Sequence, residues 1–322
     1  MSFATSVKDD LARIVSQKRC CRQAEFAACL RLAGNINIGR SQAISLTVTT
    51  QHAAAARKIF TICKDLFALE TEMIIHRKNR LKKNQVYSIH ILPQKGINKI
   101  LELVGVMNEN DIWRVDFPGP LNPKLLQKDC CKRAYLRGAF LVAGSINDPG
   151  SEYHLEIICN DLKQAFLIRD LMMEFSIKGK ITRRKHHYII YLKESDQIVD
   201  LLNVMGSYRS LLEFENTRIV KSMRNQVNRV VNCETANLNK TIQAGLKQAE
   251  DIKLIADNIG LDKLPYQLRE VAQLRLSNPE RSLSELSELM CLGRSCINHR
   301  LRRLSEIADN IRDFGTENWR NK

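Results

Sequence analysis

The side chains best suited to chemistry lie near the C-terminal end of this 322-residue chain, in a row rich in arginine. Its members are Arg294, Ser295, Asn298, His299, Arg300, Arg302 and Arg303. Arginine can donate two hydrogen bonds to guanine, and asparagine can pair in the same way with adenine, so the row suits the reading of bases in a DNA groove. His299 has no nucleophile or second base beside it, so we expect it to contact a base or a phosphate, and we expect no catalytic residue. A solvated basic helix is the alternative.

A helix-turn-helix would position this row. Pro265 marks a helix start, and Ser282 followed by Glu285 three residues later forms a capping box that opens a second helix. A short turn with Gly293 leads to a last helix over residues 294–307. Its inward positions recur at helical spacing: Ile297, Leu301, Leu304 and Ala308. This order of elements predicts that the basic row faces outward as a recognition helix.

A polar helical segment precedes this module over residues 218–229. One face of the segment is apolar, with Ile219, Met223, Val227 and Val230. The other face carries Lys221, Arg224, Asn225, Asn228 and Arg229. This face is either solvated or in contact with phosphates, and the residues alone leave both interpretations open.

The N-terminal two thirds contain an internal repeat. Residues 20–37 and 130–147 share seven identities in eighteen positions at a constant offset of 110, including a Cys-Cys pair at the start and Ala-Gly near the end. Strand patterns follow over residues 44–49, 71–77 and 86–92 and over 153–159, 180–184 and 188–192. Helical patterns follow over residues 52–69 and 97–104 and over 161–175, where Asp161 is the expected N-cap, and 195–205. A proline-rich stretch at residues 117–123 is the expected connector.

Residues 26–34 and 136–144 resemble the two signature helices of LAGLIDADG homing endonucleases. The resemblance implies that the two helices pack side by side at a pseudo-dyad and that each ends in a metal-binding acid just before the terminal glycine. Gly34 and Gly144 match the glycines, but the acidic positions are Ala33 and Ala143. The less strictly acidic positions are Arg31 and Leu141.

These substitutions argue against nuclease chemistry. Two-metal hydrolysis of a phosphodiester needs carboxylates to hold the ions, and alanine offers no ligand atom. The nearest acids, Glu25 and Asp148, lie at positions that are not equivalent in the two copies. We therefore expect no enzymatic activity.

A degenerate LAGLIDADG-like domain followed by a helix-turn-helix resembles the WhiA family of sporulation and cell-division regulators. The Cys-Cys pairs, the segment from Arg218 and the run from Ile297 to Arg302 carry this resemblance, whereas the turn at residues 292–296 is shorter than the family's and Cys296 replaces its glycine. It implies an α+β fold, with two tandem αββαββα repeats forming a pseudo-dimer, followed by an all-α helix-turn-helix domain. The expected domains are a first repeat over 1–116, a second over 117–208, a helical linker over 209–260 and the helix-turn-helix over 261–322.

The resemblance implies a DNA-binding transcriptional regulator of sporulation, cell division and chromosome segregation. Double-stranded DNA is the expected partner, with cell-division or sigma-factor proteins as further candidates and no cofactor. We expect a cytoplasmic, nucleoid-associated protein, because the sequence has no secretory signal and no apolar stretch long enough to cross a membrane.

The charge of the chain is concentrated away from the helix-turn-helix. The net charge is +15, and residues 1–208 hold +11 of it. Basic turns at residues 77–83 and 183–187 are equivalent in the two repeats and would be placed to touch phosphates symmetrically. Solubility, or a surface for an acidic partner protein, is the alternative. The alternative function is a cell-division factor acting mainly through non-specific DNA or protein contacts of the basic N-terminal domain, and it is compatible with the first.

The ten cysteines include no Cys-x-x-Cys spacing. Zinc-ribbon and thioredoxin sites both use that spacing, so we expect reduced core cysteines and no metal site.

Overall fold

The computed structural model describes residues 2–39, 43–77, 85–94, 96–107 and 121–315. It divides into two compact units, residues 1–221 and 222–322, and the long helix α8 (Tyr208–Asn258) contributes to both. Within the described residues, no helix combines the length and the apolar character that a bilayer crossing requires. The boundary falls inside α8, so each unit is described separately below.

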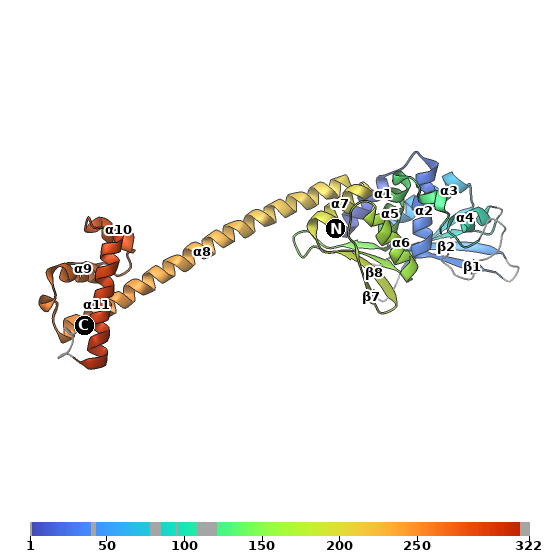
Figure 1. The fold of residues 1–322 in the computed structure, drawn as a ribbon. Coiled ribbons are helices and arrows are strands. Elements are labelled where there is room, and N and C mark those ends of the chain that lie inside the picture. Colours follow the sequence, from blue (N-terminus) through green and yellow to red (C-terminus); the bar gives the residue numbers. More distant parts are fainter. Residues whose placement is uncertain (1, 40–42, 78–84, 95, 108–120, 316–322) are drawn as a thin grey trace. The chain divides into compact units, whose positions relative to one another are not determined.

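The first unit contains two repeats with the expected αββαββα order (Figure 1). The first repeat consists of α2 (Arg19–Ala33), β1 (Gly34–Ile38), β2 (Ile44–Thr50), α3 (Ala53–Phe67), β3 (Thr71–Arg77), β4 (Gln85–Ile91) and α4 (Ile97–Leu103). The second consists of α5 (Asp129–Ala143), β5 (Gly144–Ile146), β6 (Leu155–Cys159), α6 (Leu162–Met173), β7 (Lys180–Arg184), β8 (His187–Leu192) and α7 (Ser195–Met205). Four elements of this unit were not among the residue patterns of the sequence: α1 (Phe3–Arg13), the short 3-10 helix Pro123–Leu126, and the first strand of each repeat, β1 and β5.

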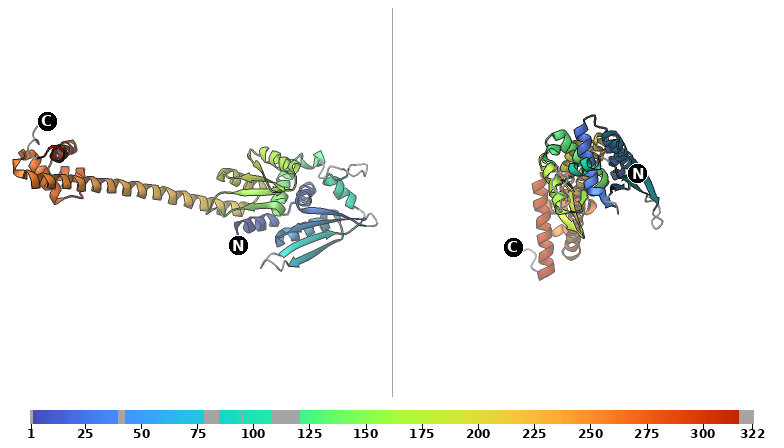
Figure 2. Two further views of the ribbon diagram at one scale, coloured as in Figure 1. Left: turned by 90° about the horizontal axis from the view of Figure 1, so that it is seen from below. Right: turned by 90° about the vertical axis from the view of Figure 1, so that its right-hand side faces the viewer.

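Each repeat forms one antiparallel four-stranded sheet, in the orders β1-β2-β4-β3 and β5-β6-β8-β7. Ile36 pairs with Leu46 in the first sheet, and Ile146 pairs with Leu155 in the second, so the apolar positions of neighbouring strands lie on the same face. The helices cover this face, and the opposite face is open, as Figure 1 and the view from below in Figure 2 both show. The open faces are therefore available for a binding partner.

Helices α2 and α5 pack side by side at the centre of the first unit. Gly138 permits this close contact, because a Cβ atom added there would lie 2.3 Å from the carbonyl oxygen of Glu25 and 3.1 Å from the Cβ of Ala28. The buried side chains Phe26, Leu136 and Phe140 belong to one core that both repeats share. The expected pseudo-dimer is thus one continuous core.

The second unit forms around the C-terminal end of α8. Ile252 and Ile255 of α8 are buried with side chains from α9 (Tyr266–Ser277), α10 (Leu283–Leu289) and α11 (Arg294–Phe314). The expected inward positions of α11 are all buried: Ile297, Leu301, Leu304 and Ala308. The apolar stripe expected on the preceding segment behaves differently, because Ile219, Met223, Val227 and Val230 are exposed on α8.

Candidate nucleic-acid interface

The start of α10 is fixed by the capping box that the sequence predicts. The Ser282 hydroxyl accepts a hydrogen bond from the backbone N–H of Glu285, and the Glu285 carboxylate accepts one from the backbone N–H of Ser282 at 2.7 Å. This hydrogen bond to the charged form lowers the pKa of Glu285. The expected capping box is therefore confirmed, and it sets the direction in which α10 enters the turn before α11.

Close packing against α8 holds the α9–α10 connection. The buried guanidinium of Arg275 donates hydrogen bonds to the carbonyl oxygens of Asn278 and Arg281, the latter at 2.6 Å, and burial lowers the pKa of this arginine. A Cβ atom at Gly245 of α8 would lie 2.1 Å from the carbonyl oxygen of Pro279, so only glycine permits this approach. The α9–α10 connection is thus held by the hydrogen bonds of the buried Arg275 guanidinium and by the close contact between the backbones at Gly245 and Pro279.

The turn before α11 is short. Cys291 has a φ of 50°, in the left-handed region, and Gly293 is the N-cap, so that α11 begins at Arg294. A left-handed residue allows the chain to reverse direction within a few residues. Arg294 and Ser295 are consequently in the first turn of α11, which in helix-turn-helix proteins is the part that reaches the bases.

Six of the seven side chains that the sequence singles out are exposed on α11: Arg294, Ser295, Asn298, His299, Arg302 and Arg303. Arg300 is half-buried and lies within 3.5 Å of the carbonyl oxygen of Gln267 on α9. At about 100° per residue, Arg300 is rotated by about 200° from Asn298. The sequence predicts Arg300 as a flanking residue of the row formed by Arg294, Asn298 and Arg302, and its partial burial against α9 distinguishes it from the six exposed side chains. A contact of Arg300 with DNA stays a prediction.

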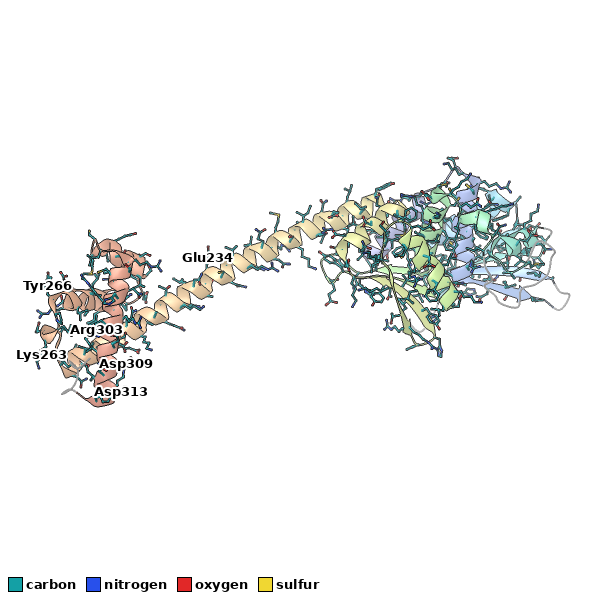
Figure 3. All side chains as sticks on the ribbon, viewed as in Figure 1. Glu234, Lys263, Tyr266, Arg303, Asp309 and Asp313 are labelled. Atoms are coloured by element: carbon teal, nitrogen blue, oxygen red, sulfur yellow. The ribbon has the colours of Figure 1, made fainter. Side chains whose placement is uncertain are left out.

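An acidic side chain lies beside this exposed face. Glu306 is 3.1 Å from the guanidinium of Arg303 and 3.6 Å from that of Arg302, and both arginines are well exposed. Figure 3 shows Arg303 and Asp309 as labelled side chains of α11. Ion pairs of this exposed kind are weak, so a DNA phosphate can compete with Glu306 for either arginine.

A buried acid ties the other face of α11 to α8. The Asp251 carboxylate, 1% exposed, accepts hydrogen bonds from the Ser305 hydroxyl at 2.8 Å and from the Arg312 guanidinium at 2.5 Å. The hydrogen bond to Asp251 is the main reason why the pKa of Arg312 is raised. This network fixes the rotation of α11 about its own axis, and with it the direction of the exposed face.

In the first unit, the two helices of the pseudo-dyad end at one hollow. Ala33 and Ala143, the positions where the LAGLIDADG pattern has its acids, both line this hollow of about 830 Å³. None of the described residues that line it is acidic, whereas Lys8, His52 and His76 do line it. The arrangement offers cationic and neutral nitrogen groups where metal-dependent cleavage would need carboxylates.

Two groups beside the hollow have shifted pKa values. Burial lowers the pKa of Lys8 to about 8. His52 Nδ1 accepts a hydrogen bond from the backbone N–H of Ala55 at 3.3 Å, and its Nε2 lies 3.5 Å from the Asp9 carboxylate. Burial also lowers the pKa of His52, which fits a neutral ring that caps α3 through Nδ1. The sequence analysis did not identify Lys8, because α1 itself was not expected.

The two acids nearest to the repeated motifs lie elsewhere. Glu25 is 1% exposed in the middle of α2, where its carboxylate is 2.5 Å from Lys58 Nζ and 3.4 Å from Arg137 Nε. Asp148 is exposed in the loop after β5 and accepts a hydrogen bond from the backbone N–H of Gly150 at 2.8 Å. Neither residue lines the hollow, so they do not form the pair of metal ligands that a nuclease would require.

The basic turn of the second repeat is exposed at the tip of the β7–β8 hairpin. Its residues 183–187 are all exposed, and Lys180, Thr182 and Arg184 alternate along β7 on the open face of the sheet. The corresponding turn of the first repeat was expected at residues 77–83, of which only Arg77, the last residue of β3, belongs to the described residues. The expected symmetry of the two basic turns therefore stays a prediction.

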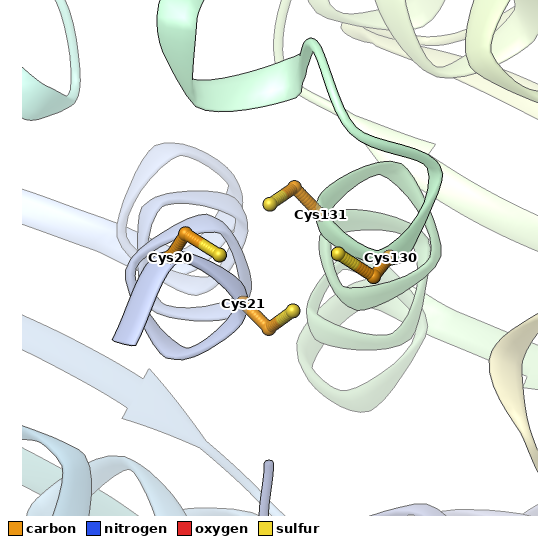
Figure 4. Close-up of side chains that lie close together, drawn as sticks. All are labelled: Cys20, Cys21, Cys130 and Cys131. Carbon is orange, nitrogen blue, oxygen red and sulfur yellow. The ribbon is translucent and has the colours of Figure 1, made fainter. Parts of the chain in front are cut away.

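Four cysteine side chains meet at the opposite end of the α2–α5 pair. The Sγ atoms of Cys20, Cys21, Cys130 and Cys131 all lie within 4.8 Å of one another. Figure 4 shows the two pairs directed into the space between the helices. Sequence reasoning missed this group, because the search for metal sites relied on spacing along the chain and the two pairs are 110 residues apart.

Comparison with known proteins gives a consistent result along the whole chain. Three family profiles match: the WhiA N-terminal LAGLIDADG-like domain at residues 19–107, the WhiA LAGLIDADG-like domain at 132–224 and the WhiA C-terminal HTH domain at 227–308. The "Probable cell division protein WhiA" of Desulforamulus reducens is 47% identical over 314 residues, which are 97% of each chain. The protein of the same name from Heliobacterium modesticaldum is 48% identical over 311 residues, 96% of each chain.

Among solved structures, the chain is similar to the full-length DUF199/WhiA of Thermatoga maritima. The sequence identity is 25% and the TM-score is 0.59, and the match covers 96% of this chain and 99% of the other. The similarity therefore extends over both units.

Proposed function

Because this chain belongs to the WhiA family, we propose that it is a DNA-binding transcriptional regulator of sporulation, cell division and chromosome segregation. It reads its target sequence with the exposed face of α11. The observation that carries this proposal is the set of six exposed hydrogen-bonding side chains on one helix that follows a capped helix and a tight turn. On this proposal Asn298 and Arg294 contact bases, and Arg302 and Arg303 contact bases or phosphates.

In this role the first unit does not cleave DNA. Ala33 and Ala143 line the hollow where carboxylates would have to hold two metal ions, and Lys8 lines it instead. A lysine ammonium suits a phosphate oxygen, so the hollow supports binding without hydrolysis. The protein acts in the cytoplasm at the nucleoid, and cell-division or sigma-factor proteins are its candidate protein partners.

A second candidate function rests on the charge of the first unit. Residues 1–208 hold +11 of the net +15, and the open face of the second sheet carries Lys180 and Arg184. In this role the protein is a cell-division factor that works mainly through non-specific DNA or protein contacts of the first unit. Each phosphate contact contributes about −0.9 to the slope of log affinity against log salt, so the two roles differ in their salt dependence.

One experiment separates these roles. The purified chain is mixed with sheared genomic DNA and magnesium at near-physiological salt, and both the retained fragments and their ends are sequenced. A shared sequence with unchanged ends supports a regulator that reads DNA without cutting it. Retention without a shared sequence supports the second role, and new uniform ends would show that the first unit cleaves DNA after all.

A further inference from the structure

We propose that Cys20, Cys21, Cys130 and Cys131 form a structural zinc site that joins the two repeats at their pseudo-dyad. Each helix supplies an adjacent pair of thiols, and the four Sγ atoms lie within 4.8 Å of one another between α2 and α5 (Figure 4). Zinc bound by four thiolates is tetrahedral, and this is the usual arrangement of a structural site.

The distances suit one ion. A tetrahedron with zinc–sulfur bonds of about 2.3 Å has sulfur–sulfur edges of about 3.8 Å. The thiols therefore need to approach one another by about 1 Å at most, which rotation of their side chains can supply. An iron–sulfur cluster places several iron and sulfide atoms between its ligands and needs a wider ring of thiols, so the spacing favours a mononuclear ion.

The symmetry of the helix pair explains how two adjacent cysteines can serve in place of a Cys-x-x-Cys motif. Neighbouring residues on a helix are about 100° apart around its axis. The two cysteines of one pair can therefore lie on either side of the direction that points to the partner helix. Two such pairs, related by the pseudo-dyad, point toward one another from both sides, as Figure 4 shows. An ion on the dyad is then held by two ligands from each repeat.

Positive groups lie beside all four cysteines. All four cysteines lie in the first turns of α2 and α5, where the positive end of the helix dipole stabilises negative charge. Neither N-cap residue, Lys18 or Lys128, has a side chain that caps its helix. Four basic residues flank the two pairs: Arg19, Arg22, Lys132 and Arg133. The acid Asp129 lies directly before Cys130, and it pairs with Lys132 together with Glu174. Zinc with four thiolates carries a charge of about −2, which the positive groups offset.

The position of the site indicates a structural role. Four protein ligands leave no open coordination position for a substrate. Thirteen residues of α2 separate Cys20 from Ala33, a rise of about 20 Å, so the site lies far from the hollow at the other end of the helices. Zinc there would hold the first turns of α2 and α5 together, and it would stabilise the folded unit by mass action.

The test uses the full chain without an affinity tag, purified under reducing conditions. We expect about one equivalent of zinc per chain by elemental analysis, and about tenfold less in the double variant Cys20→Ser/Cys130→Ser. These two cysteines are half-buried, so the substitutions disturb the core less than changes at Cys21 or Cys131 would. The matched control is Cys233→Ser, because Cys233 is exposed on α8 and should leave the zinc content unchanged.

A second measurement does not depend on any variant folding. Replacement of the metal with Co²⁺ in the wild-type chain should give the intense visible absorption of tetrahedral cobalt with thiolate ligands, and a chelator should lower its thermal midpoint. Wild-type protein that retains no zinc and gives no such cobalt absorption would overturn the proposal. So would iron with acid-labile sulfide, or disulfides between the four cysteines detected by mass spectrometry under non-reducing conditions.

Discussion

Replacement of Gly138 by alanine tests how closely the two central helices approach each other. The added Cβ would lie 2.3 Å from the carbonyl oxygen of Glu25, whereas an ordinary contact begins at 3.4 Å. The obstacle is backbone on one side and Ala28 on the other, so α2 and α5 must separate by about 1 Å. Overpacking costs about 1–3 kcal/mol, and a backbone obstacle that cannot rotate away places Gly138 in the upper part of this range, at about 2–3 kcal/mol. The better helix propensity of alanine returns about 1 kcal/mol.

We therefore expect Gly138→Ala to lower the free energy of unfolding of the first unit by about 1–2 kcal/mol. Native-state hydrogen exchange measures this effect element by element: amides of α2 and α5 should exchange faster, while those of α9–α11 keep their protection. Gly150→Ala is the matched control, because its Cβ would meet only the flexible side chain of Asp148. If Gly138→Ala is as stable as the wild type, the reasoning from the close contact of the two helices is wrong.

Three further outcomes concern DNA binding. Asn298→Ala should weaken binding to the preferred DNA sequence by about 1–3 kcal/mol in gel-shift titrations. Arg300→Ala, at a half-buried position, should leave the preference for that sequence intact. Equal losses of affinity in the two variants would contradict the assignment of the exposed face. Glu306→Gln should tighten binding by about 0.2–1 kcal/mol at low salt, because it releases two arginines, and a weaker complex would refute this competition. Burial lowers the pKa of Lys8 from 10.5 to about 8, so the folded chain gains stability as the pH rises between these values. A DNA phosphate beside Lys8 favours the charged form of this lysine, so the affinity of the wild-type chain for DNA should fall from about pH 7 to about pH 9. The affinity of Lys8→Arg should not fall over this range. Identical pH profiles would show that Lys8 does not contact DNA.

Much of the fold could be predicted because local signals and tertiary structure agree. The pattern at residues 71–77 predicts a strand, and β3 has the same bounds, Thr71–Arg77. Asp161 is the N-cap of α6, as expected, and its side chain accepts a hydrogen bond from the backbone N–H of Gln164.

The features that the sequence did not predict have a different physical origin. α11 continues to Phe314, beyond the expected residue 307, because Ile307 and Ile311 extend its buried stripe. The partial burial of Arg300 depends on where α9 packs, and the residue types along α11 do not contain that information. The cysteine group depends on two segments 110 residues apart, so linear spacing could not reveal it.

The two ends of the α2–α5 pair illustrate what a pseudo-dyad can do for a binding site. Each repeat contributes one residue at every position near the pseudo-dyad, and the two equivalent residues lie close together. The same substitution in each repeat therefore changes both sides of a binding site. At one end the repeated residue is alanine, Ala33 and Ala143, and no carboxylate stands among the described residues that line the hollow there. At the other end the repeated residues are cysteines, and their four thiols converge on one point. On our proposals, the helix pair holds a structural metal at its N-terminal end, and Lys8 makes its C-terminal end suitable for a phosphate that is bound and not cut.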